Sequence, residues 1–499
     1  MRARGTLRLG ALELSLGGAS GLVLVVAAIK LLVTLAVSNR YGFHRDEMYY
    51  RMCGLHLSLG YVDFPPVTPV LARAANLVAG DSLVALRLLS ILAGTVVLWL
   101  AARMARELGG SGTAQVLAAL AVLLAPMYLG GNLLFQTVTF DQLAWTVVLV
   151  LVLRLLRTED PRHWPPIGLA FGVGLEVKYT ILALAFGLLA GTVLSPLRAH
   201  LRTPWPWLAG LIALLLLVPN LAWQVQHGWA SLSYLQQHRS ESGSRPAFVL
   251  EQLTLVGPPL LPLLLLGFVE LFKSRRTRLL GWTCLVTVLA LFLAGGKSYY
   301  AGPLYPLLFA AGSVRLASFV DRGRPRWARP TIVALLLLGV LAAPISIPLL
   351  PARAMADTSL WKIRKDYADM VGWPDLAAQV ARVYRGLPQD ERRQTAILTW
   401  SYGLAGPIDL YGPAHGLPPP VSPHLTYYYW KPAQLRARTV IALGVPRSVL
   451  LELFRSVRQV GVVRNHLGIR NEEYGSPIAL CRQPRQSLDL VWPRLQRFG

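Results

Sequence analysis

Apolar segments of membrane length recur along the first 350 residues of the chain and alternate with short polar loops. A membrane-spanning helix needs roughly 20 mostly apolar residues. Arginines precede the first segment, and no clear cleavage site follows it. We therefore expect this segment to be a signal anchor that is retained. Eleven spans are predicted, near residues 20–38, 83–102, 114–130, 139–156, 165–176, 179–196, 206–223, 250–271, 279–295, 302–318 and 331–349.

Lysine and arginine residues gather in every second loop. The basic clusters are Arg2/Arg4/Arg8, Arg103/Arg106, Arg154/Arg157/Arg162, Arg198/Arg202, Lys273/Arg275/Arg276/Arg278 and Arg315/Arg322/Arg324/Arg326/Arg329. Since loops rich in these residues stay in the cytoplasm, each cluster indicates a return to the inner face. The N-terminus is then inside and everything after residue 350 outside. The hairpin of the fifth and sixth spans is short for two crossings, so its tip, residues 176–179, is predicted to be recessed and to face a cavity.

Composition supports a membrane protein, since 54% of the 499 residues are hydrophobic and only 15% are charged. The net charge of +24 is spread unevenly, in basic loop clusters and in the last 150 residues, and we predict no nucleic-acid partner. Three cysteines without metal-type spacing exclude a disulfide scaffold, although a single Cys53–Cys481 bridge stays open. The chain has no Gly-rich phosphate loop, so no bound nucleotide is expected.

The last 150 residues differ in character, because they are charged, richer in proline and without a spanning segment. Short β-like runs at 395–400, 439–445, 460–464 and 478–481 alternate with helix-like stretches at 375–385 and 447–458. This pattern predicts a small α/β domain. We therefore expect two domains, a transmembrane helix bundle over residues 1–350 and an extracytoplasmic α/β domain over 351–499. The basic surface of the second domain suits an anionic lipid face or simply a soluble basic domain.

Charged residues follow the first span directly. They are His44, Arg45, Asp46, Glu47 and, further on, Asp63. Apolar residues at Met48, Met52, Leu55 and Leu59 then recur with helical spacing. This predicts an amphipathic helix along the membrane surface, apolar stripe toward the lipid, with Asp46 at its N-terminal end. A carboxylate there could act as a general base. The alternative is that Asp46 merely caps the helix and Glu47 is solvated.

A second group of candidates carries positive charge. Lys178 lies in the recessed tip beside Tyr179, and Lys297 precedes Tyr299 and Tyr300. Lysine is rare near membrane depth unless it is paired or functional. Two such cations beside tyrosine hydroxyls would bind a phosphate group and stabilise it as a leaving group. The alternative is that both lysines snorkel to the interface.

Other polar residues leave several readings open. Asp141 opens the fourth span and is either a helix cap or a second acid of the site. Lys30, near the middle of the first span, must pair inward or snorkel, with Asp141 or Glu176 as conceivable partners. A metal site of His44, His56 and Asp63 stays open, although its spacing is not typical. Another set could contact sugar or lipid: Asn220, Trp223 and Gln224.

The runs Phe43–Glu47 and Gly60–Pro66 resemble the first outer loop of family 39 glycosyltransferases, relatives of protein O-mannosyltransferases and of the aminoarabinose transferase that modifies lipid A. The runs Thr139–Asp141, Lys178–Thr180, Pro219–Asn220 and Gly296–Tyr300 followed by Pro303–Pro306 resemble later motifs in the same order. The resemblance covers roughly residues 20–320. It implies a GT-C fold, a mainly α, multi-spanning bundle with a cavity open to the outside.

The resemblance also implies a function in the plasma membrane. The enzyme would move a sugar from a polyprenyl-phosphate donor to an extracytoplasmic acceptor, which is a lipid, a cell-envelope glycan or a protein. By position, Asp46 matches the base or acceptor-orienting acid, Asp141 a second acid, and Lys178 and Lys297 cations near the lipid phosphate. No cofactor is required, and a divalent cation stays open.

Two other function classes compete with this one. A transporter or lipid flippase would also use intramembrane lysine and aspartate. Against it, the sequence has no inverted repeat and its polar groups gather on one face. A structural scaffold would leave Lys178 unexplained.

Overall fold

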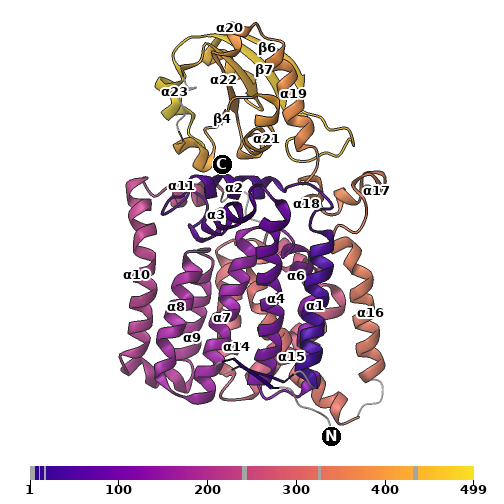
Figure 1. Ribbon diagram of the computed structural model, residues 1–499. Coiled ribbons are helices and arrows are strands. Elements are labelled where there is room, and N and C mark those ends of the chain that lie inside the picture. Colours follow the sequence, from indigo (N-terminus) through magenta and orange to yellow (C-terminus); the bar gives the residue numbers. More distant parts are fainter. Residues whose placement is uncertain are drawn as a thin grey trace.

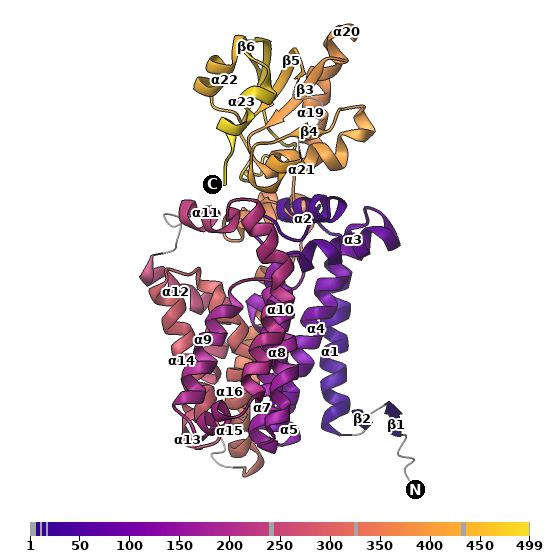
Figure 2. The same cartoon turned by 90° about the vertical axis from the view of Figure 1, so that its left-hand side faces the viewer.

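The computed structural model describes residues 6–9, 12–15, 18–238, 244–323, 328–430 and 436–498. Two parts are stacked along one axis, a bundle of helices and an α/β domain that covers one end of it (Figure 1). The N-terminal strands lie at the opposite end of the bundle, as a second view shows (Figure 2). Arg2, Arg4, Arg324 and Arg326, which belong to the predicted basic clusters, lie outside the described residues.

The helices of the bundle run roughly parallel to its axis (Figure 1). The longer ones are α1 (Ala19–Val37), α4 (Leu83–Glu107), α7 (Thr137–Thr158), α10 (Trp205–Gln226), α15 (Tyr305–Asp321) and α16 (Ala328–Ser346). The shorter ones are α5 (Gly112–Leu124), α6 (Pro126–Gly131), α8 (Trp164–Leu175), α9 (Ile181–Val193), α12 (Arg245–Val256), α13 (Leu261–Lys273) and α14 (Arg278–Leu293). Glycines allow close approach where α13 meets α15, since a Cβ at Gly267 would collide with the Leu308 carbonyl.

Every predicted span contains a helix, but not every helix is long enough to cross a bilayer. Among the described residues, six helices have the required length and hydropathy, and up to eight if each of two bent pairs counts as one span. The bends are 103° after α9 and 91° between α12 and α13. The chain is therefore a multi-pass membrane protein, and the number eleven stays a prediction.

The basic loops meet at the end of the bundle away from the α/β domain. Ion pairs join residues of different loops there, Arg157 to Glu107 (2.8 Å) and Arg276 to Glu159 (3.4 Å). Arg315 lies 3.9 Å from Glu270 in the same region. These contacts agree with the predicted alternation of loops, with basic clusters at one end and the α/β domain at the other.

Short helices lie across the end of the bundle that faces the α/β domain (Figure 1). They are α2 (Arg45–Leu55), α3 (Val67–Ala79), α11 (Ala230–Gln237), α17 (Ala352–Asp357) and α18 (Lys365–Ala368). The tip between α8 and α9 lies beneath this layer, because the backbone N–H of Val67 at the start of α3 donates to the Glu176 carbonyl (3.0 Å). The hairpin tip is thus recessed, as the short spans predicted.

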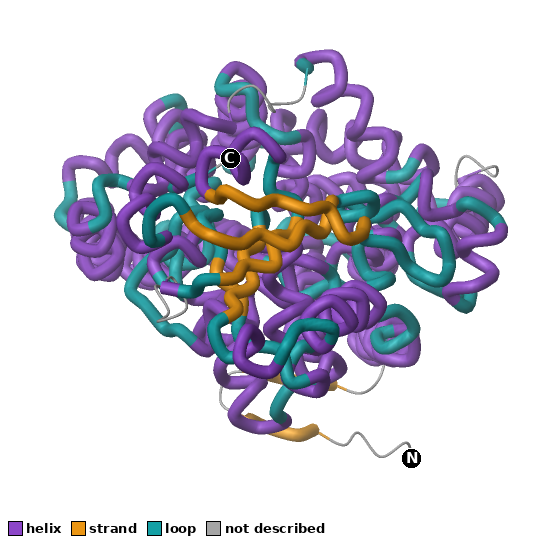
Figure 3. Tube along the Cα trace, turned by 90° about the horizontal axis from the view of Figure 1, so that it is seen from above, coloured by secondary structure: helices purple, strands orange, loops and turns teal. Residues whose placement is uncertain are grey.

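The α/β domain contains a five-stranded sheet of order β4-β3-β5-β7-β6. Its strands are β3 (Thr395–Thr399), β4 (Pro420–Val421), β5 (Thr439–Leu443), β6 (Phe454–Val462) and β7 (Pro477–Pro484). β3 is parallel to β4 and β5, whereas β7 is antiparallel to β5 and β6. The helices are α19 (Trp373–Arg385), α20 (Gln389–Arg392), α21 (Tyr402–Tyr411), α22 (Arg447–Leu453) and α23 (Leu488–Leu495). Seen from above, the sheet lies over the helix bundle (Figure 3).

One predicted element of this domain is wrong in part. The helix expected over 447–458 ends at Leu453, and Phe454 opens strand β6. The reason is tertiary, because β7 offers this segment a pairing partner, with Val457 opposite Cys481. Pairing with a neighbouring strand overrides local helix preference here. The three cysteines are buried and free, so the Cys53–Cys481 bridge does not form.

Helix α2 is shorter than its apolar stripe suggested, and the two methionines of that stripe face protein instead of lipid. Met48 packs against Gly406 of α21, and Leu59 lies beyond the end of the helix at Leu55. On another side, Gly54 lies so close to α3 that a Cβ would stand 2.9 Å from the Arg73 nitrogen. Because protein covers α2 from both directions, its methionines are buried in a protein interface.

A buried ion pair holds α2 to the bundle. Arg87 of α4 donates from Nε to Glu47 Oε1 (2.9 Å) and from Nη2 to Glu47 Oε2 (2.8 Å), and both side chains are fully buried. Backbone carbonyls of Ser38 and Gly42 accept further bonds from the same guanidinium. The Phe135 N–H donates to Glu47 (2.9 Å), so the loop before α7 joins as well. The bidentate geometry makes this a directional link among three segments.

Lys30 finds a different partner from those considered. Its ammonium is fully buried and donates to the Tyr128 carbonyl of α6 (2.7 Å), not to Asp141 or Glu176. Carbonyls near the C-terminal end of a helix lack helical donors and accept such bonds readily. Lys30 therefore ties α1 to α6 inside the bundle.

We predict that Arg87→Met lowers the free energy of unfolding by about 3–5 kcal/mol, because it leaves the Glu47 carboxylate buried and unpaired. Denaturant titration in mixed micelles would measure the change. Arg276→Met is the control, since it breaks an exposed pair and should cost less than about 1 kcal/mol. Equal losses in the two variants would contradict the role of the buried pair.

We also predict the orientation in the membrane. A cysteine introduced at exposed Ser456 of β6 should react with a membrane-impermeant maleimide in intact cells, whereas one at exposed Ser274 should not. The natural cysteines are buried, which keeps the background low. The reverse labelling pattern would place the α/β domain in the cytoplasm.

Candidate active site

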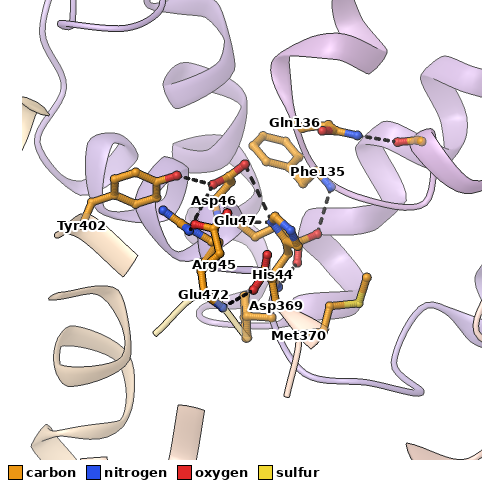
Figure 4. A network of polar contacts seen from close by, with 12 residues as sticks. His44, Arg45, Asp46, Glu47, Phe135, Gln136, Asp369, Met370, Tyr402 and Glu472 are labelled. Atoms are coloured by element: carbon orange, nitrogen blue, oxygen red, sulfur yellow. Dashed lines mark hydrogen bonds and ion pairs between the residues drawn. The ribbon is translucent and has the colours of Figure 1, made fainter. Parts of the chain in front are cut away.

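The N-terminus of α2 is held in place by reciprocal capping. The Asp46 N–H donates to Nδ1 of His44 (3.2 Å), and the His44 N–H donates to Glu47 (2.7 Å). This arrangement satisfies amides that otherwise have no helical partner. His44 is thus the cap itself, and Asp46 lies inside the first turn at the junction of bundle and α/β domain (Figure 4).

The two adjacent carboxylates have different environments. Glu47 is fully buried, and bonds from Arg87, His44 and Phe135 occupy both its oxygens. The reading of Glu47 as a solvated residue is therefore wrong. Its contacts hold the carboxylate in place, and the catalytic role predicted for it stays a prediction. The side chain of Asp46 is 34% exposed, so this carboxylate is the one that a substrate can reach.

The α/β domain contributes directly to the surroundings of Asp46. The Tyr402 hydroxyl of α21 donates to Asp46 Oδ1 (2.7 Å). Burial, together with the Asp46 charge, holds the pKa of Tyr402 well above its usual range, so the phenol stays protonated and can donate. Arg45 stacks over the same ring at 4.6 Å, and its guanidinium pairs with Glu472 (Figure 4). Arg45 therefore connects α2 to the second domain.

Asp63 lies in the loop after α2. The Tyr49 hydroxyl donates to Asp63 (2.9 Å), and Tyr49 is also within 2.9 Å of the Thr426 hydroxyl. Burial raises the pKa of Asp63 to about 7, although the bond from Tyr49 opposes the shift. The Val62 N–H donates to the Thr426 hydroxyl (3.2 Å). Asp63 thus belongs to a second contact between the loop and the α/β domain.

Asp141 and Lys178 come together at the recessed tip. Asp141 is buried one turn into α7, where it accepts bonds from Trp145 Nε1 (2.9 Å) and from Thr180 (2.8 Å). It is not the helix cap, because that position belongs to Gln136. The charge of Lys178 lies within electrostatic range of Asp141. Asp141 thus anchors the tip to α7 and partly balances the lysine.

Two tyrosines cover Lys178. Its ammonium stands 5.1 Å from the ring centre of Tyr299 and 4.9 Å from that of Tyr300, on the 3₁₀ helix η5 (Ser298–Leu304). Lys297 precedes this turn, is exposed, and acts on Lys178 as a like charge. The cations and tyrosines singled out in the sequence therefore form one group. Cation–π contacts of this kind place the charge without neutralising it.

Tyr50 is buried, and its ring packs against Phe64 and Phe135. It is on α2, in electrostatic range of Asp46 and Asp63, and it hydrogen-bonds Thr137 at the start of α7. Tyr299 in turn lies in electrostatic range of Tyr50. The start of α7 connects the two groups, the carboxylates and the cations, because Phe135 just before it binds Glu47 and Asp141 within it binds Thr180 of the tip.

The remaining candidates mainly hold the structure together. The Tyr179 hydroxyl donates to Asn220 (2.6 Å), and Gln224 donates to Ser231 (2.7 Å). Trp223 packs against Gly60, where any Cβ would clash with the indole. Together these contacts attach the end of α10 to the tip and to the loop after α2.

The residues considered for a metal site have separate partners. His44 caps α2, His56 stacks on Trp430 at 4.4 Å, and Asp63 binds Tyr49. Among the described residues, no group of three or more His, Cys, Asp or Glu side chains could hold an ion. Metal independence stays a prediction.

Sequence reasoning missed Arg87, Tyr402, Glu472 and Thr426. For Arg87 a signal existed, because an arginine within a membrane-length apolar segment needs a buried partner. The other three residues had no such signal. They lie on the surface of the α/β domain that docks on the bundle, and no sequence motif marks that surface.

Comparison with protein families and solved structures places this geometry in context. Residues 63–223 match the family described as dolichyl-phosphate-mannose-protein mannosyltransferase, a range that includes Asp63, Asp141, Lys178 and Tyr179 but not Asp46 or Lys297. A search of curated proteins found no match.

The structure of ArnT from Cupriavidus metallidurans bound to undecaprenyl phosphate has a TM-score of 0.63 and 15% identity, covering 93% of this chain and 98% of that chain. The apo structure of the same protein has a TM-score of 0.58 at the same identity and coverage. The oligosaccharyltransferase of Archaeoglobus fulgidus, tethered to an acceptor peptide, has a TM-score of 0.46 and 13% identity over 77% of this chain and 62% of that one. The chain therefore has the GT-C fold seen in the ArnT structures, and its residues 63–223 are similar to the dolichyl-phosphate-mannose-protein mannosyltransferase family.

Proposed function

We propose that this protein transfers a sugar from a polyprenyl-phosphate donor to an acceptor on the extracytoplasmic side of the plasma membrane, with Asp46 as the general base. The observation that carries the proposal is that an accessible carboxylate, Asp46, and a cation held by two tyrosine rings, Lys178, lie at the same end of the bundle. It provides a base and a cation for the two ends of one displacement. Undecaprenyl phosphate in the ArnT structure is the kind of lipid that such a donor would leave behind.

The chemistry needs one proton transfer and one departing phosphate. An acceptor hydroxyl attacks the anomeric carbon and gives its proton to Asp46, while the bond from that carbon to the phosphate oxygen breaks. Asp46 suits the role of base because it is accessible and is oriented by the Tyr402 hydroxyl. A positioned general base contributes typically 10²–10⁴-fold to the rate.

Lys178 and Lys297 would hold the departing phosphate. Lys178 faces the rings of Tyr299 and Tyr300, so its ammonium is retained at the tip instead of reaching bulk water. Lys297 adds a second, exposed positive charge nearby. A dianionic lipid phosphate would relieve the repulsion between the two lysines, which favours binding of the product-like state.

Donor turnover tests the proposal against its rival. The purified protein in liposomes is incubated with labelled polyprenyl-phosphate sugars and candidate acceptors, and release of free polyprenyl phosphate is measured. A flippase would move the labelled lipid between leaflets without cleaving it. That result would refute the transferase assignment.

We predict that Asp46→Asn abolishes sugar transfer but leaves donor binding intact, because the base is lost and the phosphate site is not. Tyr402→Phe should lower kcat about 10- to 150-fold with little change in KM for the donor, since a charge-assisted hydrogen bond that orients the base is lost. Asp81→Asn is the control, as Asp81 pairs with Arg51 at the same end of the bundle. Turnover of Asp46→Asn at the wild-type rate would refute its role.

We predict that Lys178→Met and Lys297→Met each weaken donor binding about 10- to 150-fold, the effect of losing a charge-assisted hydrogen bond in a partly desolvated site. Arginine at either position should recover part of the loss, because it restores charge but not the compact ammonium. Binding of labelled donor in nanodiscs is the measurement. Lys273→Met, at the opposite end of the bundle, should bind normally. Normal binding by both Met variants at 178 and 297 would place the phosphate elsewhere.

A further inference from the structure

A pocket of about 590 Å³ opens on the α/β domain between α22 and α23. We call it the arginine pocket, after Arg485, Arg494 and Arg497 in its lining. The ring of Trp400 forms one wall, and Glu452 is the single acid. Three positive charges against one negative charge give the lining a net charge of +2. The volume lies in the range of small-molecule sites, which is about 300–1,000 Å³.

Backbone carbonyls and a ring hold two of the arginines in place. Arg497 stacks over Trp400 at 4.4 Å and donates to the Trp400 carbonyl (3.2 Å). Arg485 donates to the Leu451 carbonyl (3.3 Å). Backbone carbonyls orient a guanidinium but leave most of its charge uncompensated. Arg494 has no hydrogen-bond or ion-pair partner within the described residues, so its donors are available.

The pocket adjoins the network that reaches Asp46. Trp400 precedes Tyr402 by two residues, a separation of at most about 7 Å between Cα atoms. His424 stacks on the Tyr402 ring at 5.5 Å and forms a short parallel β-bridge with Arg497. Burial, assisted by Arg497 and Arg45, lowers the pKa of His424 to about 3, so its imidazole is neutral and accepts from the Tyr402 N–H. One side of the pocket is therefore built from Trp400 and Arg497, which adjoin the residues that hold the proposed base.

We infer that the arginine pocket binds the acceptor of the proposed transfer reaction and that this acceptor is an anionic saccharide, one that carries a phosphate or a carboxylate. Guanidinium groups bind either anion through paired hydrogen bonds, and an indole ring offers an apolar face to a sugar. Helices α22 and α23 lie clear of the bundle in both side views (Figures 1 and 2), which favours a glycan in water over a lipid headgroup in the bilayer. The inference rests on the proposed function and names its acceptor class.

Calorimetric titration tests the inference with the full-length protein in phosphatidylcholine nanodiscs. The probes are glucose 6-phosphate, glucuronate and uncharged glucose. Both anions should bind at least about tenfold more tightly than glucose. Arg494→Met should weaken both anions about tenfold or more, because it removes the most available guanidinium without disturbing a packed residue. Arg447→Met is the matched control, an exposed arginine of α22 that does not line the pocket, and it should bind as the wild type does.

Four results would overturn the inference. They are the absence of binding by either anion, equal binding of glucose, equal losses in Arg494→Met and Arg447→Met, and displacement of the anions when the nanodiscs contain phosphatidylglycerol. The last result would assign the pocket to a lipid headgroup. None of these titrations contains donor lipid, so their outcome is independent of whether the protein cleaves polyprenyl-phosphate sugars.

Discussion

The geometry of the candidate active site depends on one buried ion pair, Glu47 with Arg87. Removing both charges from water carries a large desolvation cost, which good geometry and additional hydrogen bonds must offset. Here the pairing is bidentate, and the two backbone carbonyls on the guanidinium and the two backbone amides on the carboxylate supply those bonds. The link joins α2, α4 and the loop before α7 at a single point. Since Asp46 is the neighbour of Glu47 in the same helical turn, its position follows from this link.

Charge in the site is divided between two depths. The accessible carboxylate lies at the junction with the α/β domain, and the cations lie beneath α3 around the tip of a short hairpin. Helices α8 and α9 are each shorter than a full crossing needs. The turn between them, which carries Lys178, therefore lies below the surface layer. Tyrosines lie at both depths, Tyr402 beside Asp46 and Tyr299 and Tyr300 beside Lys178. Their hydroxyls can hydrogen-bond to either charge without adding one of their own.

The sequence predicts the bundle well and the site in part. Apolar runs predicted where the bundle helices lie, but they merged α5 with α6 and also α12 with α13, which meet at a bend of 91°. Runs rich in β-branched residues identified β3 and β5, because strands that are buried on both faces are continuously apolar. Spacing also singled out Asp46 and Lys178. The same spacing predicted that the methionines of α2 face lipid, whereas Met48 packs on Gly406 of α21. An apolar stripe does not show which partner covers it. Strand β6 was missed in part for the same reason, because pairing with β7 is decided elsewhere in the chain.

The bond between Tyr402 and Asp46 joins residues that are 356 positions apart. In a chain made from its N-terminus, Asp46 emerges early and its partner only near the end of synthesis. The α/β domain must then fold and dock before the carboxylate acquires its final orientation. Completion of the site is thereby coupled to completion of the whole polypeptide. A truncated or stalled chain would carry the acid without the hydroxyl that aims it, and such a chain would stay inactive in the membrane.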